Sequence, residues 1–289
     1  MQNDSSLESA ADSTNAPTYR EVRYRHSSDF MPIMSGLGAS LLISTYQAGK
    51  VAVVGTTGAG LHLSLHNFEQ AMGLAVHPRK IAVGVRGAIW FLRAAAEFAP
   101  RLDPPGRHDA CYLARSSFIT GNIHSHEMAW CGDELWIVNT LFSCLCTLDD
   151  DFSFVPRWQP PFVRELAGED RCHLNGLALV NDRPAYVTAM AESNEPAGWR
   201  PTKATSGCLI DVSSGETVVR GLSMPHSPRV HGGRLWVLNS GCGALELADR
   251  QSGKHEVVAR MPGYTRGLAF CGDYAFIGLS RIRETAVFG

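Results

Sequence analysis

Short apolar stretches alternate with clusters of Gly, Asp, Asn and Ser along most of the chain. The stretches are only a few residues long, rich in Val, Ile, Leu, Trp and Phe, and seldom show the period of an amphipathic helix. Such a pattern is typical of many short β-strands joined by tight turns. The sequence therefore predicts an all-β fold.

The predicted strands recur as a unit made of a strand, a turn with Gly, Asp or Asn, and a second strand. The unit is found in the segments 72–85, 127–140, 176–188, 229–240 and 267–278. Successive copies are separated by roughly 40 to 55 residues, which is the length of one four-stranded propeller blade. A further hairpin over residues 41–55 brings the total to about six units. We therefore predict a β-propeller of about six four-stranded blades, because a two-sheet sandwich would explain the strands but not the repeat.

Both ends of the chain differ from this repeat. Residues 1–30 are polar, rich in Ser, Asp and Asn, and lack the apolar core of a signal peptide, which predicts a disordered leader. Residues 31–289 are predicted to form one propeller domain, and the missing export signal favours a cytoplasmic location. The last residues, 283–289, fall in the middle of a blade, so that blade is expected to be incomplete. Either the leading segment completes it or the chain lacks a C-terminal piece.

Composition and charge narrow the range of partners. The 289 residues carry 26 basic and 28 acidic side chains, giving a net charge of −2 with both signs interspersed. This balance argues against nucleic acid or an anionic membrane as the main partner, and no apolar run reaches the ~18 residues of a membrane span. The expected partner is a small molecule or a peptide. The sequence contains no P-loop, nucleophile elbow, HExxH or dinucleotide-binding motif.

The eight cysteines are scattered, mostly within apolar stretches, which predicts small buried side chains and not a disulfide framework. Cys144 and Cys146 lie two residues apart, on one face of a predicted strand. A soft metal ion could bind such a pair, but no Cys-x-x-Cys or mixed Cys/His pattern accompanies it.

The propeller register places several histidines at one mouth of the central channel. The innermost strand of a blade begins at one face and the second strand returns to it, so the residues flanking these strands should meet there. His124, His173 and His226 precede first strands in successive blades, and His126 lies two residues after His124. Convergent imidazoles can hold a divalent or redox-active metal, so these four are the predicted metal ligands. The alternative is that they only satisfy backbone groups around a water-filled mouth.

Charged residues near the same positions are the candidate catalytic groups, together with one of the histidines: His126, Glu127, Arg229 and Arg266. Glu127 could serve as an oxygen ligand or a base, although alternation along an extended backbone directs it away from His126. Either arginine could bind a carboxylate through two parallel hydrogen bonds. The alternative for the arginines is a salt bridge between blades, with an acid such as Asp170.

Further residues are predicted to bind a ligand at this mouth. They are Asn139, Asn175, Asn239, Tyr264 and Trp199. The first four lie beside the ends of predicted strands, whereas Trp199 belongs to an insertion over residues 190–207. An insertion of this length, with cationic residues close to the tryptophan, is either a lid over the mouth or a plain surface loop.

Several longer motifs resemble one protein family. They are Ser44–Lys50, Leu135–Cys144, Glu169–Ala178, Gly221–Arg229 and Arg266–Leu268. In these motifs, and over nearly everything from about residue 30 onward, the chain is similar to the uncharacterised bacterial domain family DUF4915, also grouped as TIGR03032. The resemblance implies a propeller but assigns no activity and no catalytic residue. Members carry Asp at the position of Glu127 and continue beyond the end of this chain, which favours truncation.

Two functions follow from these observations. The first is an enzyme that modifies a small molecule or a peptide at a His-, Asn- and Arg-lined site, with or without a metal. The second is a non-catalytic module that binds a protein or a small ligand through the same face.

Overall fold

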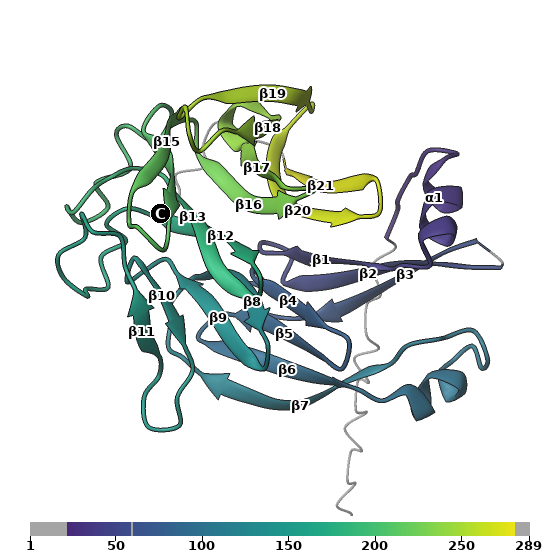
Figure 1. The fold of residues 1–289 in the computed structure, drawn as a ribbon. Coiled ribbons are helices and arrows are strands. Elements are labelled where there is room, and N and C mark those ends of the chain that lie inside the picture. Colours follow the sequence, from purple (N-terminus) through teal and green to yellow (C-terminus); the bar gives the residue numbers. More distant parts are fainter. Residues whose placement is uncertain (1–21, 59, 281–289) are drawn as a thin grey trace, which may run out of the picture.

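The computed structural model describes residues 22–58 and 60–280, which form 21 β-strands, one α-helix and two short 3₁₀-helices (Figure 1). The strands are paired antiparallel and fall into six sheets that follow one another in chain order. This arrangement confirms the all-β propeller fold. Residues 1–21 of the predicted leader, and residues 283–289 of the predicted last blade, lie outside the described residues.

Four sheets have the four strands of a complete blade. The first contains β4 (Leu74–His77), β5 (Lys80–Val85), β6 (Ala88–Ala94) and β7 (Tyr112–Ile119), with the 3₁₀-helix η1 (Ala96–Arg101) between the last two. The second contains β8 (Ser125–Cys131), β9 (Glu134–Asn139), β10 (Cys144–Thr147) and β11 (Val155–Trp158). The third contains β12 (Leu174–Val180), β13 (Arg183–Ala189), β14 (Gly207–Asp211) and β15 (Thr217–Leu222). The fourth contains β16 (Pro225–His231), β17 (Arg234–Asn239), β18 (Ala244–Ala248) and β19 (His255–Arg260), with the 3₁₀-helix η2 (Ser240–Cys242) after β17.

The sheets at the two ends of the described chain are smaller. Helix α1 (Phe30–Leu37) precedes a sheet of three strands, β1 (Leu41–Thr45), β2 (Lys50–Thr57) and β3 (Gly60–Asn67). The last sheet has two strands, β20 (Tyr264–Cys271) and β21 (Tyr274–Ser280). Five of the six sheets begin with a strand of one inner series, β4, β8, β12, β16 and β20, so the described strands correspond to five blades rather than the predicted six or so. The difference arises because a hairpin in the sequence identifies a repeat unit without showing that its other strands are present.

The hydrophobic core lies between neighbouring sheets. Ala75 and Ile89 of one blade pack with Met128 and Ile137 of the next, and all four are buried. Equivalent clusters join the other pairs of successive sheets. Because each of the four complete blades is covered on both faces by its neighbours, the strands stand radially, and the inner strands β4, β8, β12, β16 and β20 contact one another in series.

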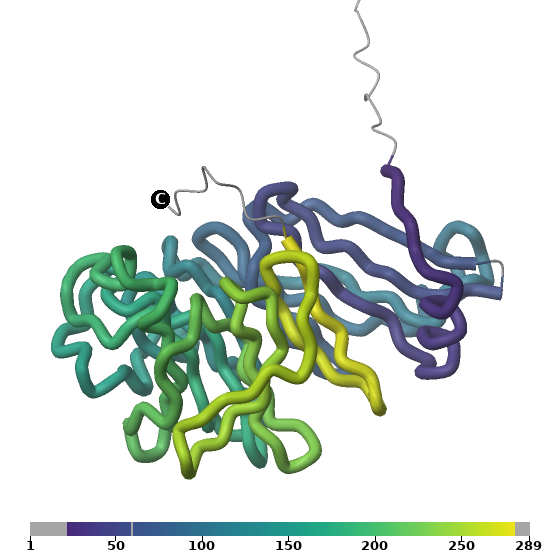
Figure 2. The backbone as a smooth tube through the Cα atoms, turned by 90° about the horizontal axis from the view of Figure 1, so that it is seen from above, coloured from purple at the N-terminus to yellow at the C-terminus, as the bar shows by residue number. Residues whose placement is uncertain are grey.

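The last sheet returns to the first. A Cβ atom added to Gly272, in the turn between β20 and β21, would lie 3.4 Å from Leu37 of α1. Arg266 of β20 and Tyr46, in the turn after β1, are electrostatic neighbours. Figure 1 shows β20 and β21 beside β1, and the view from above in Figure 2 shows the same proximity. The inner strands consequently surround a common axis.

The cysteines follow the sequence prediction in the interior of the sheets. Cys144 and Cys146 are fully buried in the cluster between two blades and form no disulfide. The contact with Cys146, followed by burial, raises the pKa of Cys144 above its ordinary value. Burial likewise raises the pKa of Cys172 to about 12. Protonated, buried thiols pack as small apolar groups, so the soft-metal interpretation finds no support here.

Candidate functional site at the mouth of the inner strands

The segments that lead into the inner strands share an unusual backbone conformation. Gln70, His124, His173 and Met224 occupy equivalent positions in four successive blades and have φ values of 52°, 51°, 51° and 47°. A left-handed conformation costs a residue with a side chain about 1 kcal/mol or more, so the fold must compensate for it at each position. The propeller therefore imposes one common geometry on the start of its inner strands.

Two residues after these four lie Met72, His126, Asn175 and His226, and Arg266 lies on the inner strand of the following blade. The electrostatic contacts of His126 show that this group is compact, because they include Arg266, His173 and His226. The sequence register thus correctly brings residues from four different blades into one cluster, which we call the mouth cluster: His126, His173, His226, Tyr264 and Arg266.

His126 and His226 are held in the same way. The Nδ1 atom of His126 lies 3.2 Å from the carbonyl oxygen of His124, and 2.8 Å from Oγ1 of Thr140. The Nδ1 atom of His226 lies 3.0 Å from the carbonyl oxygen of Met224. A carbonyl oxygen can only accept, so each Nδ1 carries the proton and each Nε2 keeps a lone pair. Neither Nδ1 is therefore available to a ligand.

Both of these rings are neutral at physiological pH. Burial is the main cause that lowers the pKa of His226 and of His126 well below 6.5, and the positive charge of Arg266 is the next. Burial also lowers the pKa of His124, and Asp170 acts in the opposite direction there. His126 and His226 are consequently neutral imidazoles next to one fixed cation, Arg266.

Arg266 and Tyr264 carry polar groups without a protein partner. The guanidinium of Arg266 makes no hydrogen bond or ion pair within residues 22–58 and 60–280, and burial lowers its pKa. The hydroxyl of Tyr264 is buried and lacks a hydrogen-bond partner among the described residues, and its ring lies 5.7 Å from that of His226. Burial raises the pKa of Tyr264 to about 12, so its hydroxyl is a donor at neutral pH. An unpaired buried hydroxyl such as that of Tyr264 needs an explanation.

His173 is fixed by a carboxylate and an indole. Its Nδ1 atom lies 2.9 Å from Oδ2 of Asp170, and the ring centroids of His173 and Trp199 are 4.3 Å apart. The indole Nε1 of Trp199 donates to the same Oδ2 at 3.1 Å. The ring of His126 meets His173 edge to face, with the centroids 4.9 Å apart. Asp170 is the residue that sequence reasoning undervalued, since its only signal is a position three residues before His173 in a polar segment.

Glu127 and Arg229, two of the candidate catalytic groups, are partners of each other in the structure. The carboxylate of Glu127, on β8, forms an ion pair with Arg229, on β16, and accepts the backbone N–H of Leu177, on β12, at 3.1 Å. Arg229 also donates to the carbonyl oxygen of Leu177 at 3.0 Å. The alternative of a salt bridge between blades thus applies to Arg229, with Glu127 and not Asp170 as its partner.

The oxygen atoms of the predicted ligand-binding asparagines have structural roles, whereas the Nδ2 atoms of Asn139 and Asn175 are buried and lack a hydrogen-bond partner among the described residues. Oδ1 of Asn139 accepts the backbone N–H of Phe142 at 3.0 Å, and Oδ1 of Asn239 accepts that of Ser223 at 2.7 Å. Oδ1 of Asn175 accepts the hydroxyl of Thr188 at 2.7 Å. All three asparagines are almost completely buried. These side chains therefore fix strand ends and loops beside the mouth.

The insertion over residues 190–207 is packed onto the propeller. Trp199 is 1% exposed, and the backbone N–H of Met224 donates to the carbonyl oxygen of Lys203 at 3.0 Å. The backbone N–H of Ala197 donates to the carbonyl oxygen of Glu169 at 2.9 Å. Trp199 consequently lies behind His173 as a support and has no surface to offer to a ligand.

The predicted metal site is not supported by this geometry. Within residues 22–58 and 60–280 no group of three His, Cys, Asp or Glu side chains is arranged to hold a metal ion. The unpaired charge of Arg266 also makes the cluster unfavourable for a cation, because its charge acts on both His126 and His226. No metal is therefore assigned to His124, His126, His173 and His226.

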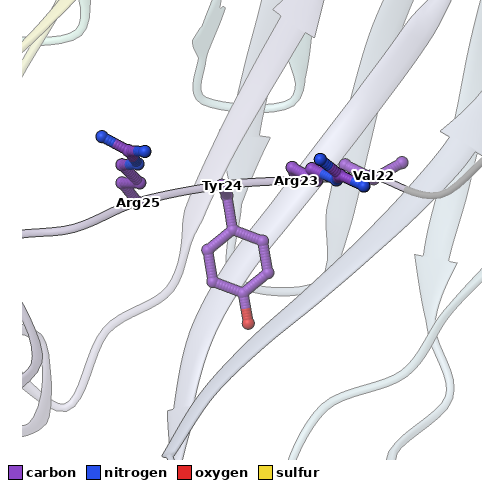
Figure 3. Close-up of a pocket in the computed structure, with 4 residues that line it drawn as sticks. All are labelled: Val22, Arg23, Tyr24 and Arg25. Carbon is purple, nitrogen blue, oxygen red and sulfur yellow. The ribbon is translucent and has the colours of Figure 1, made fainter.

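A separate cavity borders the segment that precedes α1. It has a volume of about 590 Å³ and is lined by Val22, Arg23, Tyr24 and Arg25 (Figure 3). Figure 3 shows Tyr24 and Arg25 pointing to opposite sides of the segment. Four consecutive exposed residues do not provide the convergent polar groups of a binding site, so the mouth cluster remains the candidate.

Among the residues that the structure describes, no helix is long and apolar enough to span a bilayer.

Acidification is expected to destabilise the protein through His126 and His226. At pH values below 6.5, the ordinary pKa of histidine, both rings bind a proton in the unfolded chain. In the folded protein their pKa values are lowered, so they stay unprotonated. The free energy of unfolding should therefore fall as the pH is lowered from 7, by up to about 1.4 kcal/mol per pH unit for each ring. Urea unfolding between about pH 7 and pH 5 measures this slope. His226→Asn should reduce it and His66→Gln, at an exposed position, should not; equal slopes in all three proteins would contradict the assignment.

Two solved structures that resemble this chain show its fold class. A streptogramin B lyase has a TM-score of 0.51 at 12% sequence identity, with 85% of this chain and 74% of that chain covered. The WD40 β-propeller domain of Doa1 has a TM-score of 0.51 at 11% identity, with 83% of this chain and 86% of that chain covered. At such low identity the likeness concerns the fold alone. No match was found among curated protein sequences.

The sequence profile described as "Domain of unknown function (DUF4915)" matches residues 28–289. This range contains all of the described sheets and the complete mouth cluster. The resemblance seen in the sequence motifs is thereby confirmed, and the chain belongs to the DUF4915 family.

Proposed function

We propose that the protein binds a small anionic molecule, such as a carboxylate, at the mouth cluster. The observation that carries the proposal is the guanidinium of Arg266, which is half-buried and has no ion-pair or hydrogen-bond partner within the described residues. Withdrawing part of a charge from water costs free energy, and a partner of opposite charge offsets that cost. An anionic ligand supplies the missing partner through charge-assisted hydrogen bonds.

The neighbours of Arg266 add a pattern of donors and acceptors. The buried hydroxyl of Tyr264 has no hydrogen-bond partner among the described residues and can donate to the same anion. The neutral rings of His126 and His226 each carry an Nε2 lone pair that accepts a hydrogen bond from a ligand. This combination suits a small molecule with a carboxylate and a hydroxyl or ammonium group close to it. The alternative function is binding of a peptide or protein through this face. Such a partner would also have to supply an acidic group to Arg266.

Calorimetric titration with a set of simple anions tests the proposal. Phosphate, acetate, lactate, malate and glycine are suitable probes because they vary the anion and the adjacent donor separately. Arg266→Gln is expected to weaken binding of the best probe by about tenfold or more, since a hydrogen bond to a charged group contributes about 1.5–3 kcal/mol. Arg86→Gln provides the matched control, because Arg86 is exposed and pairs only with Glu69. Equal affinity in the Arg266→Gln protein, or no binding of any probe, would overturn the proposal.

A further inference from the structure

We propose that His173 is a general base that acts on the ligand of the mouth cluster, and that Asp170 and Trp199 position it. This inference rests on the proposed anion binding for its substrate class, which is a small molecule whose anionic group is held by Arg266. The rest of its support comes from a different set of contacts, those behind His173.

The carboxylate of Asp170 fixes the tautomer of His173. Its two oxygens lie 3.0 and 2.9 Å from Nδ1 of His173, and a carboxylate can only accept. Nδ1 therefore carries the proton, and the lone pair is on Nε2. The carboxylate also compensates the positive charge that the ring acquires when it accepts a proton, which is the role of the acid in an Asp–His pair.

Trp199 fixes the orientation of both groups. Its indole N–H donates to Oδ2 of Asp170 at 3.1 Å, and its ring covers one face of His173 at a centroid distance of 4.3 Å. Trp199 is 1% exposed and is the largest fully buried side chain of the described residues. A buried indole with its N–H satisfied by a carboxylate is a rigid support. The insertion over residues 190–207 therefore contributes to the site by placing Trp199 against Asp170 and His173.

The backbone of Asp170 and His173 lies in the left-handed region, with φ values of 50° and 51°. The equivalent residues of neighbouring blades, such as Gly121 and His124, are also left-handed, so this turn belongs to the propeller scaffold. Each such residue costs about 1 kcal/mol or more, and strained residues persist where the surrounding structure fixes them. The backbone N–H of Asp170 is held by the carbonyl oxygen of Leu141 at 2.8 Å, and that of Ala197 by the carbonyl oxygen of Glu169 at 2.9 Å. The chain thus holds Asp170 and His173 together across a turn that is unfavourable by itself.

His173 also lies beside the proposed position of the ligand. Its ring contacts that of His126 edge to face, and it is an electrostatic neighbour of both His126 and His226, which in turn are neighbours of Arg266. The only other imidazoles of the mouth cluster, His126 and His226, are backed by carbonyl and hydroxyl oxygens and not by a carboxylate. His173 is therefore the member of the cluster equipped to take up a proton.

In the proposed step the Nε2 lone pair of His173 accepts a proton from an O–H or an acidic C–H group of the bound anion. The bond between that substrate atom and its hydrogen breaks, its electron pair stays on the substrate, and His173 becomes an imidazolium paired with Asp170. Return of the proton to the substrate or product restores the neutral ring, so the step requires no oxidant, reductant or other reactant.

The test uses diethyl pyrocarbonate, which reacts with an imidazole nitrogen that has an accessible lone pair. The intact folded protein is treated with the reagent and then digested, and mass spectrometry of the peptides measures the rate of modification at each histidine. His173 is expected to react, and Asp170→Asn should slow its reaction by about tenfold or more, because an amide places an NH₂ group against either the Nδ1–H of His173 or the N–H of Trp199. Trp199→Phe, which keeps an aromatic ring but removes the donor, should have a smaller effect in the same direction.

His226 provides the internal control, because it has the same tautomer without a carboxylate. Its reaction rate should be unchanged by Asp170→Asn, so a general loss of structure would be recognised by a change at both rings. Nitrogen NMR of His173 should show the proton on Nδ1 in the original protein and its displacement in the Asp170→Asn protein. An unreactive His173, or one whose rate and tautomer do not respond to Asp170→Asn, would overturn the inference. Failure of phosphate or another anion to slow the reaction would instead count against the proposed anion site.

Discussion

Arg229→Met is expected to lower the free energy of unfolding by about 3 kcal/mol, because removal of one partner of a largely buried ion pair leaves the other charge uncompensated. The side chains of Arg229 and Glu127 are 30% and 11% exposed, and together with Leu177 they connect the inner strands of three blades. The carboxylate of Glu127 would keep only the backbone N–H of Leu177 as a partner. Chemical denaturation followed by tryptophan fluorescence measures the change.

The double variant Glu127→Gln/Arg229→Met is the control for this interpretation. With the carboxylate also removed, the double variant should be more stable than the sum of the two single changes predicts, by about 1 kcal/mol or more. Additive effects would show that the pair does not couple the blades. Arg220, on the outer strand β15, forms an exposed ion pair with Glu192. Arg220→Met should therefore change the free energy of unfolding by less than about 1 kcal/mol.

Gly176→Ala is expected to destabilise the protein by about 3 kcal/mol, because the inner strands β12 and β16 approach each other closely at this glycine. A Cβ atom there would lie 2.4 Å from Cδ of Pro228, 2.4 Å from Oγ1 of Thr188 and 2.9 Å from the backbone nitrogen of Ser227. A proline ring and a backbone atom cannot move aside without displacing a whole strand. Denaturant unfolding under the same conditions measures the loss.

Gly36→Ala is the matched control for this substitution. Gly36 lies inside α1, and an added Cβ would meet no atom within 4 Å. Alanine is favoured over glycine in a helix by roughly 1 kcal/mol, so this variant should be unchanged or slightly more stable. A Gly176→Ala protein as stable as the Gly36→Ala protein would contradict the close approach of the two blades.

The propeller could be predicted because each blade repeats one pattern of strands and turns. Gly267–Cys271 and Tyr274–Gly278, for example, follow the same rule as the segments that form β12 and β13. The number of blades was less accessible, since the outer strands have no signature as clear as that of the inner two. The repeat identifies where a blade begins and not how many strands it contains.

The positions of the mouth cluster could also be predicted, but the partners of its neighbours could not. The register correctly placed His126, His173, His226 and Arg266 near one another. It could not show that Glu127 would be used by Arg229, because the two are 102 residues apart and meet only through the packing of three blades. Asn139 and Asn239 were similarly indistinguishable from ligand-binding residues, since an asparagine after a strand suits both a turn and a ligand.

The common left-handed turn before the inner strands fixes the backbone at the mouth independently of the side chains that follow it. Since four blades set this backbone through equivalent positions, the side chains that follow can be exchanged without rebuilding the scaffold. Met72, His126 and His226 follow this turn by two residues, so their side chains can change while the backbone stays the same. A combinatorial library limited to these three codons is expected to retain a folded propeller while changing which molecule it binds, and relatives that differ there are expected to differ in ligand and not in architecture.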